Sequence, residues 1–497
     1  MTQRAAMEEM ETFLREHPET EAVEAFVTDP TGVARGKLMR VHELERIYRE
    51  GRPLPCSIMS LDITGEDVEE TGLVWEAGDA DKIAWPIPGR LKPAPWRSRP
   101  TGELLLSLYE PDGGPYIADP RHVLVRTVER LKADGLHPVV AAELEFYLVD
   151  PKRGADGRLQ PPAAPATGRR LDRIDVYSVT ELEEFAPFVD ELYATAKAMD
   201  LPAETLISEY AAGQLEVVLR HRPDALQAAD EAILWKRAVR GIAAKHGLLA
   251  TFMVKPYAGR TGSGFHIHAS LADAAGQNLF ASEDPEGTPL MRQAIAGLLA
   301  TIADGMGVFA PNANSYRRFQ ASSYAPVART WGVNNRSVAI RVPTGAPASR
   351  HLEHRVAGAD ANPYLAIAAV LAGMHKGIRE KLDPGKAVEG NGYAQSQADL
   401  PNDWPAALRT MKGSAFLKDC FGERFVEIFN AIKAAECRRF SAQVSEVDLE
   451  WYLGRGSDVL EVSNRIAPHR DYHQTTVESP VNNSDGAEAQ GQVCAVE

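Results

Sequence analysis

Hydrophobic and polar positions alternate most clearly over residues 142–148, which read Ala-Glu-Leu-Glu-Phe-Tyr-Leu. This alternation predicts a β-strand. Successive side chains of a strand point to opposite faces, so Glu143 and Glu145 would share one face while Leu144 and Phe146 take the other. Two adjacent carboxylates on a half-buried face repel each other. The pattern therefore predicts either a bound divalent cation between them or an edge strand whose acidic face is solvated.

The same patterning divides the chain into regions. Residues 4–17 predict a short amphipathic helix, and the next hundred residues predict strands near 22–27, 33–41, 58–63, 82–87 and 103–109, with a proline-rich loop at 86–100. Long helical patterns then follow at 120–134, 181–199, 223–246, 288–308 and 362–382, with more helices between 404 and 452. They alternate with strand patterns at 137–149, 204–209, 213–220, 248–254, 264–271, 336–342 and 350–356. We expect an N-terminal helix (1–17), a small α+β domain (18–114), a large second domain (115–455) and a mobile tail (456–497).

Glutamate and histidine side chains recur on one face of several of these strands. His266 and His268 share a face of the 264–271 strand, and Glu353 shares a face with Arg355. Together with Glu143 and Glu145, the glutamates and histidines of these strands make up an oxygen-rich set of potential metal ligands: Glu143, Glu145, Glu209, Glu216, Glu353 and one or two imidazoles. Such a set favours Mg²⁺ or Mn²⁺ over zinc. Several carboxylates suit two or more ions, which indicates phosphate chemistry inside an open barrel.

Two groups of arginines and a glycine-rich loop add to this picture. Arg318 ends the run 314–318, while Arg336 and Arg341 would point to opposite faces unless their strand bends. Guanidinium groups suit carboxylate and phosphate, although an arginine taken alone more often forms a surface ion pair. The glycine-rich residues 255–264 enter the histidine strand and permit close approach to a ligand, but lack the spacing of a Walker or Rossmann motif.

Composition narrows the class of protein. The chain has 497 residues, 44% of them hydrophobic and 25% charged, as in ordinary soluble globular proteins. Its net charge of −15 argues against binding to nucleic acid or to anionic membranes. The four cysteines are scattered, the start has no signal-peptide core, and no run of 18 apolar residues occurs. We therefore expect a cytoplasmic enzyme acting on small molecules.

Several short motifs, taken together, resemble the glutamine synthetase superfamily. They occur in family order over about residues 20 to 455 and comprise Glu143-Leu144-Glu145, Gly213-Gln214-Leu215-Glu216, Lys255-Pro256-Tyr257, 261–266 with Ser270, Asn314-Ser315-Tyr316-Arg317-Arg318, 335–341, Glu353-His354-Arg355 and Ala361-Asn362-Pro363-Tyr364. The resemblance implies an α+β fold. A β-grasp domain would precede a catalytic domain built on an open, mostly antiparallel, barrel-like sheet flanked by helices.

The resemblance also implies roles for individual residues. One metal ion would be held by three glutamates, namely Glu145, Glu209 and Glu216. A second ion, beside the ATP γ-phosphate, would be held by Glu143, His266 and Glu353. Glutamate would be bound by Gly262, Arg318 and Arg355, and the transferred phosphate by Arg336 and Arg341. The nucleotide would lie near His268, Ser270 and Arg336. The implied cofactors are ATP and two or three Mg²⁺ or Mn²⁺ ions per site, in a dodecamer of two hexameric rings.

Two departures from the family pattern bear on the amine substrate. Family members that use ammonium carry a glutamate in the flap after Arg318, where this chain has Tyr324. The Asp-Gly-Ser-Ser motif is also missing, and residues 60–65 read Ser-Leu-Asp-Ile-Thr-Gly. An aromatic ring in place of a carboxylate favours a larger, partly apolar amine. Asp62 and its acidic neighbours could receive the far ammonium of a diamine, or could form a solvated loop.

These features resemble the γ-glutamylpolyamine synthetase branch. We expect an ATP-dependent ligase that joins the γ-carboxylate of L-glutamate to an amine, with putrescine or another polyamine favoured. The alternatives are an alkylamine or an aniline-type amine, plain glutamine synthetase using ammonium, and a non-catalytic structural or sensor relative. Tyr393 lies roughly where some family members are adenylylated, but its surroundings differ, and no such control is predicted.

Overall fold

The computed structural model describes residues 4–76 and 78–454. Its contacts group residues 1–442 into one compact unit and residues 443–497 into a second, of which only α13 (Glu446–Tyr452) and its flanks are described. The predicted tail, 456–497, lies outside the described residues, and the predicted domain boundaries stay predictions. None of the described helices is both long enough and apolar enough to cross a membrane.

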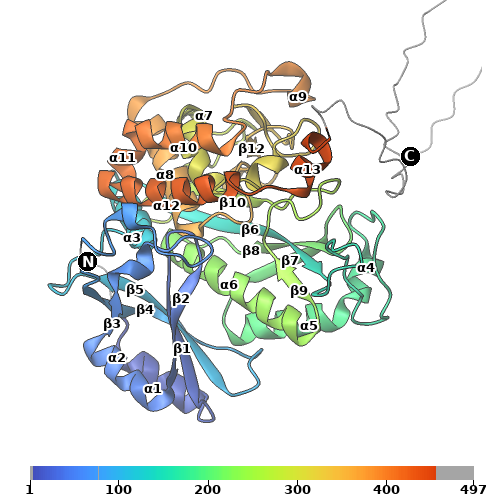
Figure 1. The fold of residues 1–497 in the computed structure, drawn as a ribbon. Helices are drawn as coiled ribbons and strands as arrows, with labels where there is room; N and C mark the ends of the chain where they lie inside the picture. The colour runs from blue at the N-terminus through green and yellow to red at the C-terminus, as the bar shows by residue number, and fades with distance from the viewer. Residues whose placement is uncertain (1–3, 77, 455–497) are drawn as a thin grey trace, which may run out of the picture. The chain divides into compact units, whose positions relative to one another are not determined.

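The N-terminal part of the chain forms a mixed five-stranded sheet with the order β2-β1-β5-β4-β3. Its strands are β1 (Ala22–Thr28), β2 (Ala34–Arg40), β3 (Arg52–Pro55), β4 (Asp81–Pro93) and β5 (Thr101–Tyr109). Only the β1–β5 pair is parallel among these described strands. The helices α1 (Met7–Glu16) and α2 (Leu44–Glu50) lie beside this sheet (Figure 1).

Two predictions in this region are wrong. The expected strand at 58–63 is instead a 3-10 turn at Cys56–Met59 followed by a loop, because the Asp62 carboxylate accepts the backbone N–H groups of Thr64 and Glu66 and closes a turn. The expected loop at 86–100 is strand as far as Pro93. A register shift between Pro86 and Leu91 lets prolines, which cannot donate to a ladder, remain in the strand.

The larger sheet carries the candidate chemistry. Its path is β11-β12-β13-β10-β6-β8-β7, with β9 also pairing with β6, and every described pair except β11–β12 is antiparallel. The strands are β6 (His137–Val149), β7 (Ala203–Ser208), β8 (Gln214–Leu219), β9 (Leu249–Thr251), β10 (Phe265–Ala272), β11 (Trp331–Val333), β12 (Ile340–Val342) and β13 (Leu352–His354). The predicted α+β fold with an open, mostly antiparallel sheet is confirmed.

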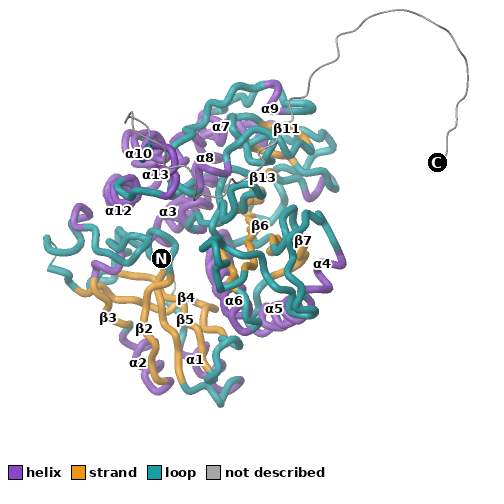
Figure 2. The backbone as a smooth tube through the Cα atoms, turned by 45° about the vertical axis from the view of Figure 1, so that its right-hand side comes forward, coloured by secondary structure: helices purple, strands orange, loops and turns teal. Residues whose placement is uncertain are grey.

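Ten further helices are described in the first unit, and most of them pack over this sheet or on one another (Figures 1 and 2). They are α3 (Pro120–Ala133), α4 (Val179–Glu184), α5 (Ala186–Ala198), α6 (Ala225–Lys245), α7 (Pro289–Phe309), α8 (Pro363–Glu380), α9 (Gly392–Gln395), α10 (Trp404–Gly413), α11 (Ala415–Phe421) and α12 (Glu423–Ser441). Most begin at the predicted positions, with Asp119, Asp224 and Asn362 as N-caps. The helix expected at 181–199 breaks at Phe185, because Pro187 suits a helix start and not an interior.

One buried ion-pair network joins the N-terminal sheet to the helices α3, α6 and α8. The Asp230 carboxylate on α6 accepts from Arg121 on α3 (2.9 Å), from Arg90 on β4 (3.3 Å) and from the Tyr364 hydroxyl on α8 (2.6 Å). All four side chains are buried. Removing one partner of a buried pair leaves an uncompensated charge, so this network fixes the N-terminal sheet against the helices.

Candidate active site

The register of the larger sheet brings the predicted acidic and histidine residues together. On β6, Glu143 lies opposite His266 of β10, and Glu145 lies opposite Glu216 of β8. Glu353 of β13 lies between His268 of β10 and Arg341 of β12. Because alternate residues share a face, Leu144 and Phe146 point away from these groups into the core, where both are fully buried. The predicted alternation is confirmed.

A cavity of about 360 Å³ opens over this polar face. Twelve of the residues predicted for the site line it, namely Glu143, Glu145, Glu209, Glu216, Gly262, His266, Arg318, Tyr324, Arg336, Arg341, Glu353 and Arg355. Arg336 and Arg341 would point to opposite faces of one continuous strand. The strand begins only at Ile340, however, and residues 334–338 before it form a bend, so both side chains reach the cavity.

Three predicted residues lie outside this cavity. The His268 ring is adjacent, with Nε2 at 3.2 Å from a Glu143 carboxylate oxygen. Ser270 is buried further along β10. Asp62 belongs to the N-terminal region, and its buried carboxylate is engaged by the Thr64 hydroxyl and by Arg439. Within one chain, therefore, Asp62 does not join the site.

Histidines control the charge of Glu143. Burial alone would raise the pKa of this carboxyl, but the charges and hydrogen bonds of His266 and His268 outweigh burial and hold the pKa well below its ordinary value. His266 Nδ1 is hydrogen-bonded to Glu143 and lies 3.7 Å from Glu353, while its Nε2 lies 3.9 Å from Glu145. Glu143 is thus a stable carboxylate at neutral pH.

Two arginines do the same for Glu353. Arg341 donates to one carboxylate oxygen at 2.8 Å, and Arg355 pairs with the other. Burial opposes ionisation of Glu353, but Arg355 and the neighbouring histidines lower its pKa to about 2. This carboxylate therefore stays charged, and it fixes both guanidinium groups at the wall of the cavity.

Glu209 and Glu216 behave in the opposite way. Burial, followed by the charge of Glu145, raises the pKa of Glu209 to about 7. Burial and the charges of Glu143, Glu145 and Glu209 raise the pKa of Glu216 well above its ordinary value. These two carboxyls hold protons because the described protein groups around them provide too little positive charge.

This set of donors fits divalent cations. Two groups of side chains have ligand atoms within 4.8 Å of one another, one formed by Glu143, His268 and Glu353 and the other by Glu143, Glu216 and His266. His268, which the family resemblance places near the nucleotide, thus also lies in a position to bind metal, as the strand pattern allowed. Oxygen-rich sites of this kind suit Mg²⁺ or Mn²⁺, and a cation would relieve the repulsion that protonates Glu209 and Glu216.

We expect the affinity for Mn²⁺ or Mg²⁺ to rise with pH. A carboxyl with a raised pKa must lose its proton before it binds a cation, and that proton leaves more readily as the pH approaches and passes about 7. For the same reason the metal-free protein loses stability as pH rises from the ordinary glutamate pKa through 7. Differential scanning fluorimetry should therefore show a larger metal-induced rise in Tm at about pH 8 than at about pH 6. In Glu209→Gln this difference should shrink. An equal rise at both pH values in the unaltered protein would contradict the prediction.

Arg318 is a buried cation aimed at this cavity. Its guanidinium donates to the carbonyls of Val356 (2.9 Å) and Arg355 (3.2 Å) and lies 3.4 Å from His266 Nε2. Within the described residues no carboxylate lies within 4.0 Å of it, and burial lowers its pKa. A buried guanidinium without a carboxylate partner is well suited to bind the carboxylate of a ligand.

Gly264 permits the close packing of this corner. A Cβ there would lie 2.8 Å from both Arg318 Nη2 and His266 Nε2. We expect Gly264→Ala to displace both side chains, to destabilise the protein by about 1–3 kcal/mol and to weaken metal binding. Gly259→Ala, in the same loop, is a matched control because its Cβ would meet nothing within 4 Å. Titration of Mn²⁺ followed by Tm should separate the two variants. Equal metal affinity in both would refute the packing argument.

The flap after Arg318 places an aromatic ring at the mouth of the cavity. Tyr324 is 60% exposed and has a left-handed backbone (φ 58°), as does Ser322 (φ 61°). Such a conformation is costly for a tyrosine and marks a constrained segment. The Tyr393 hydroxyl donates to the Ala325 carbonyl at 2.9 Å and anchors the flap.

The sequence-based predictions missed several lining residues. Gln214 donates to Glu145 (3.2 Å) and to the Gly262 carbonyl (3.1 Å). It therefore links the glycine-rich loop to the acidic wall, the side of the cavity formed by Glu143, Glu145, Glu209, Glu216 and Glu353. It shares a strand face with Glu216, and that spacing could have identified it. Tyr177 and Tyr210 also line the cavity. Tyr210 directly follows Glu209, whereas Tyr177 lies in an irregular loop whose pattern gave no signal.

Comparison with known protein families decides the relationship. The glutamine synthetase catalytic domain matches residues 117–452, about two thirds of the chain. The chain belongs to the glutamine synthetase family. This assignment confirms the family resemblance inferred from the motifs.

Individual members of the family are also similar. The chain is 40% identical to γ-glutamylputrescine synthetase PuuA of Escherichia coli (strain K12) over 449 residues, covering 90% of this chain and 95% of the relative. It is 30% identical to glutamate–isopropylamine ligase of a Pseudomonas species over 455 residues, covering 89% and 96% of the two chains. Among solved structures, GmaS in complex with ADP superposes with a TM-score of 0.76 at 27% identity, covering 91% of this chain and 100% of that one.

Proposed function

We propose that this protein is an ATP-dependent ligase that joins the γ-carboxylate of L-glutamate to an amine, with putrescine or a related polyamine as the favoured acceptor. The observation that carries this proposal is the cavity itself, where ionised and proton-bearing glutamates face buried arginines. The similarity to a γ-glutamylputrescine synthetase and to a glutamate–isopropylamine ligase supports it.

The acidic wall would hold the metal ions. In this proposal Glu145, Glu209 and Glu216 bind one ion, and Glu143, His266 and Glu353 bind a second. The geometry groups Glu216 with Glu143 and His266, and His268 with Glu143 and Glu353, so Glu216 and His268 are also placed to contribute to the ion at Glu143. Bound Mg²⁺ or Mn²⁺ would supply positive charge to the phosphates of ATP during transfer. The residues fit this role because they provide several oxygen donors on one face of a rigid sheet.

The remaining residues would act on the substrates directly. Arg318 and Arg355 would hold glutamate beside Gly262, so that its γ-carboxylate attacks the γ-phosphorus of ATP and ADP leaves. Arg336 and Arg341 would bind the transferred phosphoryl group and disperse its charge, which is the main requirement of phosphoryl transfer. The amine then attacks the γ-carbonyl carbon of γ-glutamyl phosphate, phosphate leaves, and the nitrogen gives up a proton. Ser270 and His268 would lie on the nucleotide side.

The flap would select the amine. Tyr324, Tyr177 and Tyr210 all line the cavity, and their rings offer apolar surface and cation–π contact to an alkylammonium chain. Ammonium has no chain with which to use these contacts. The arrangement therefore favours a substituted amine over ammonium.

An amine panel tests the proposal. Purified protein with glutamate, ATP and Mg²⁺ should release phosphate, and kcat/KM should be highest for diamines, lower for isopropylamine and aniline, and lowest for ammonium. Equal values for putrescine and ammonium would refute the amine assignment while leaving a glutamate ligase. Absence of phosphate release with every amine would refute the ligase itself.

We further propose that the chain assembles into a dodecamer of two hexameric rings. Asp62 does not reach the cavity of its own chain, so a part for it in the reaction would require a second subunit. Its carboxylate would then have to release Arg439 to receive a diamine. Multi-angle light scattering should give about twelve times the 54.2 kDa chain mass for the active protein. An active monomer would reject this assembly.

A further inference from the structure

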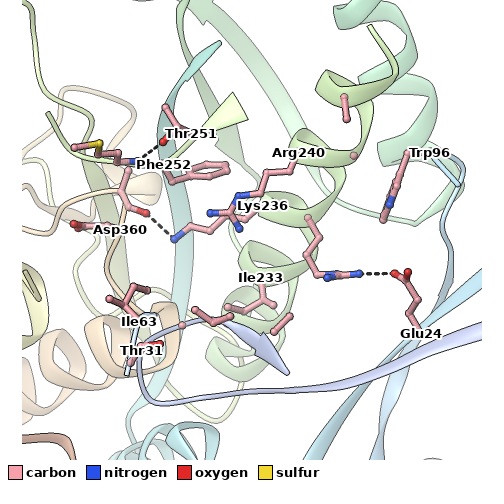
Figure 3. Close-up of a pocket in the computed structure, with 18 of the residues that line it drawn as sticks. Glu24, Thr31, Ile63, Trp96, Ile233, Lys236, Arg240, Thr251, Phe252 and Asp360 are labelled. Carbon is pink, nitrogen blue, oxygen red and sulfur yellow. Dashed lines mark hydrogen bonds and ion pairs between the residues drawn. The ribbon is translucent and has the colours of Figure 1, made fainter. Parts of the chain in front are cut away.

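A second, larger cavity of about 1010 Å³ lies away from the acidic wall. It is bounded by the β1–β2 turn, the loop after β4, one side of α6, and β9. Figure 3 shows Lys236 and Arg240 extending from α6 into it, with Phe252 above and Trp96 at the far side. None of the residues proposed for the ligase reaction lines this cavity.

Most charges in this cavity are paired within the described chain. Arg97 lies 3.1 Å from Glu24, and Arg237 pairs with Glu24 at 2.7 Å and with Glu103. Lys245, at the end of α6, pairs with Glu191. Arg97 and Arg237 both pair with the Glu24 carboxylate, so Glu24 does not also neutralise the two other basic residues of the cavity, Lys236 and Arg240.

Lys236 and Arg240 are the basic residues of this cavity that have no carboxylate partner within the described chain. Their charged groups lie 5.4 Å and 5.1 Å from the centre of the same Phe252 ring, so both reach the same region of the cavity. Lys236 is 8% exposed, and among the described residues it donates only to the carbonyls of Ala359 (2.7 Å) and Ala361 (3.2 Å). Over residues 4–76 and 78–454, no carboxylate lies within 4.0 Å of either cation.

The nearby Asp360 carboxylate does not neutralise them. One of its oxygens accepts from Asn312 (2.6 Å) and Ser315 (2.7 Å), and the other has no hydrogen-bond partner in the part of the chain that the structure describes. Burial, followed by the charge of Arg240, lowers the pKa of Lys236 to about 7. Two uncompensated cations side by side repel each other, and a bound anion would stabilise both.

We propose that this cavity binds a small organic anion, whose carboxylate or phosphate group is held by Arg240 and Lys236 beneath the Phe252 ring. The guanidinium of Arg240 offers a fork for two oxygens, and Lys236 supplies a compact positive charge. Ile233, Phe252 and Trp96 provide apolar surface for the body of the ligand, and the volume suits a metabolite-sized molecule.

Isothermal titration calorimetry of the full-length protein tests this site. The probes are inorganic phosphate, succinate and phenyl phosphate, at constant ionic strength. The arginines of the acidic-wall cavity can bind the same anions, so we expect one saturable site per chain in addition to any binding there. The affinity of this additional site should be at least about tenfold weaker in Arg240→Gln, the size of effect expected for losing one charge-assisted contact. Tighter binding of phenyl phosphate than of inorganic phosphate would identify the contribution of the apolar surface. The ratio of the affinity for succinate to the affinity for phosphate shows whether the site prefers carboxylates or phosphates.

Two control variants make the outcome decisive. Arg46→Gln removes an exposed arginine of α2 that pairs with Glu50, away from the cavity, and should bind like the unaltered protein. Arg336→Gln removes a cation of the acidic-wall cavity and should also leave this affinity unchanged. Absence of binding, or binding lost in Arg336→Gln and retained in Arg240→Gln, would overturn the proposal. A change in assembly mass in Arg240→Gln without any change in anion affinity would mean that a second copy of the chain covers the cavity, and would overturn it too.

Discussion

Glu143→Gln should reduce turnover by at least about a thousandfold, since metal-assisted charge stabilisation contributes several kcal/mol to reactions of this kind. Glu143 belongs to both groups of potential metal ligands and contacts both His266 and His268. The substitution keeps the shape of the side chain and removes its charge. It therefore tests the charge of the acidic wall without creating a cavity. The measurement is phosphate release with glutamate, ATP and putrescine, together with Mn²⁺ affinity.

A control variant at another glutamate shows whether loss of any glutamate charge on this sheet lowers turnover. Glu204 lies on β7 of the same sheet, is about half exposed at its side chain and pairs with Arg220 at the surface. Glu204→Gln should keep turnover within about twofold, as expected for an exposed ion pair. Full turnover in Glu143→Gln would show that this wall does not hold the catalytic metals.

Tyr324→Glu should shift the preference from putrescine to ammonium. The change removes the ring that would contact the alkyl chain and introduces a carboxylate that can attract a small cation. We expect the ratio of kcat/KM for putrescine to that for ammonium to fall by about tenfold or more, because cation–π and aromatic contacts contribute about 1–2 kcal/mol. Both tyrosine and glutamate are strained by the left-handed backbone at this position, so the exchange adds no new backbone cost.

Tyr324→Phe separates the ring from the hydroxyl. It keeps the aromatic surface and should leave the putrescine preference within about twofold, as removal of an exposed hydroxyl would. Parallel assays with both amines on the three proteins provide the comparison. An unchanged ratio in Tyr324→Glu would show that the flap ring does not select the amine.

Strand alternation was enough to predict the acidic wall. Glu143, Glu145, His266 and Glu353 are fixed by the two-residue period of strands, and their cross-strand neighbours follow once the strands pair antiparallel. Long helices such as α6 and α8 were predicted to within a few residues, because an apolar stripe and an Asp or Asn cap mark them clearly.

Irregular segments could not be predicted in the same way. Tyr177 lines the cavity from a loop without periodicity, and the turn around Asp62 depends on side-chain to backbone hydrogen bonds that no hydrophobic pattern encodes. The charge state of Glu209 also could not be predicted from the sequence, because its raised pKa comes from burial in the assembled sheet and from the charge of Glu145. The pairing of Lys236 and Arg240 with one ring likewise exists only after α6 packs on β9.

The short stretch from Val356 to Ala361 serves both cavities. At one end its carbonyls receive Arg318, and at the other they receive Lys236. If an anion draws Lys236 towards itself, the stretch whose other end orients Arg318 loses a tether. Thermodynamic linkage then demands reciprocity, so glutamate must alter the affinity for the anion by the factor by which the anion alters the affinity for glutamate. Two ligands that never touch would thus sense each other through six residues of backbone.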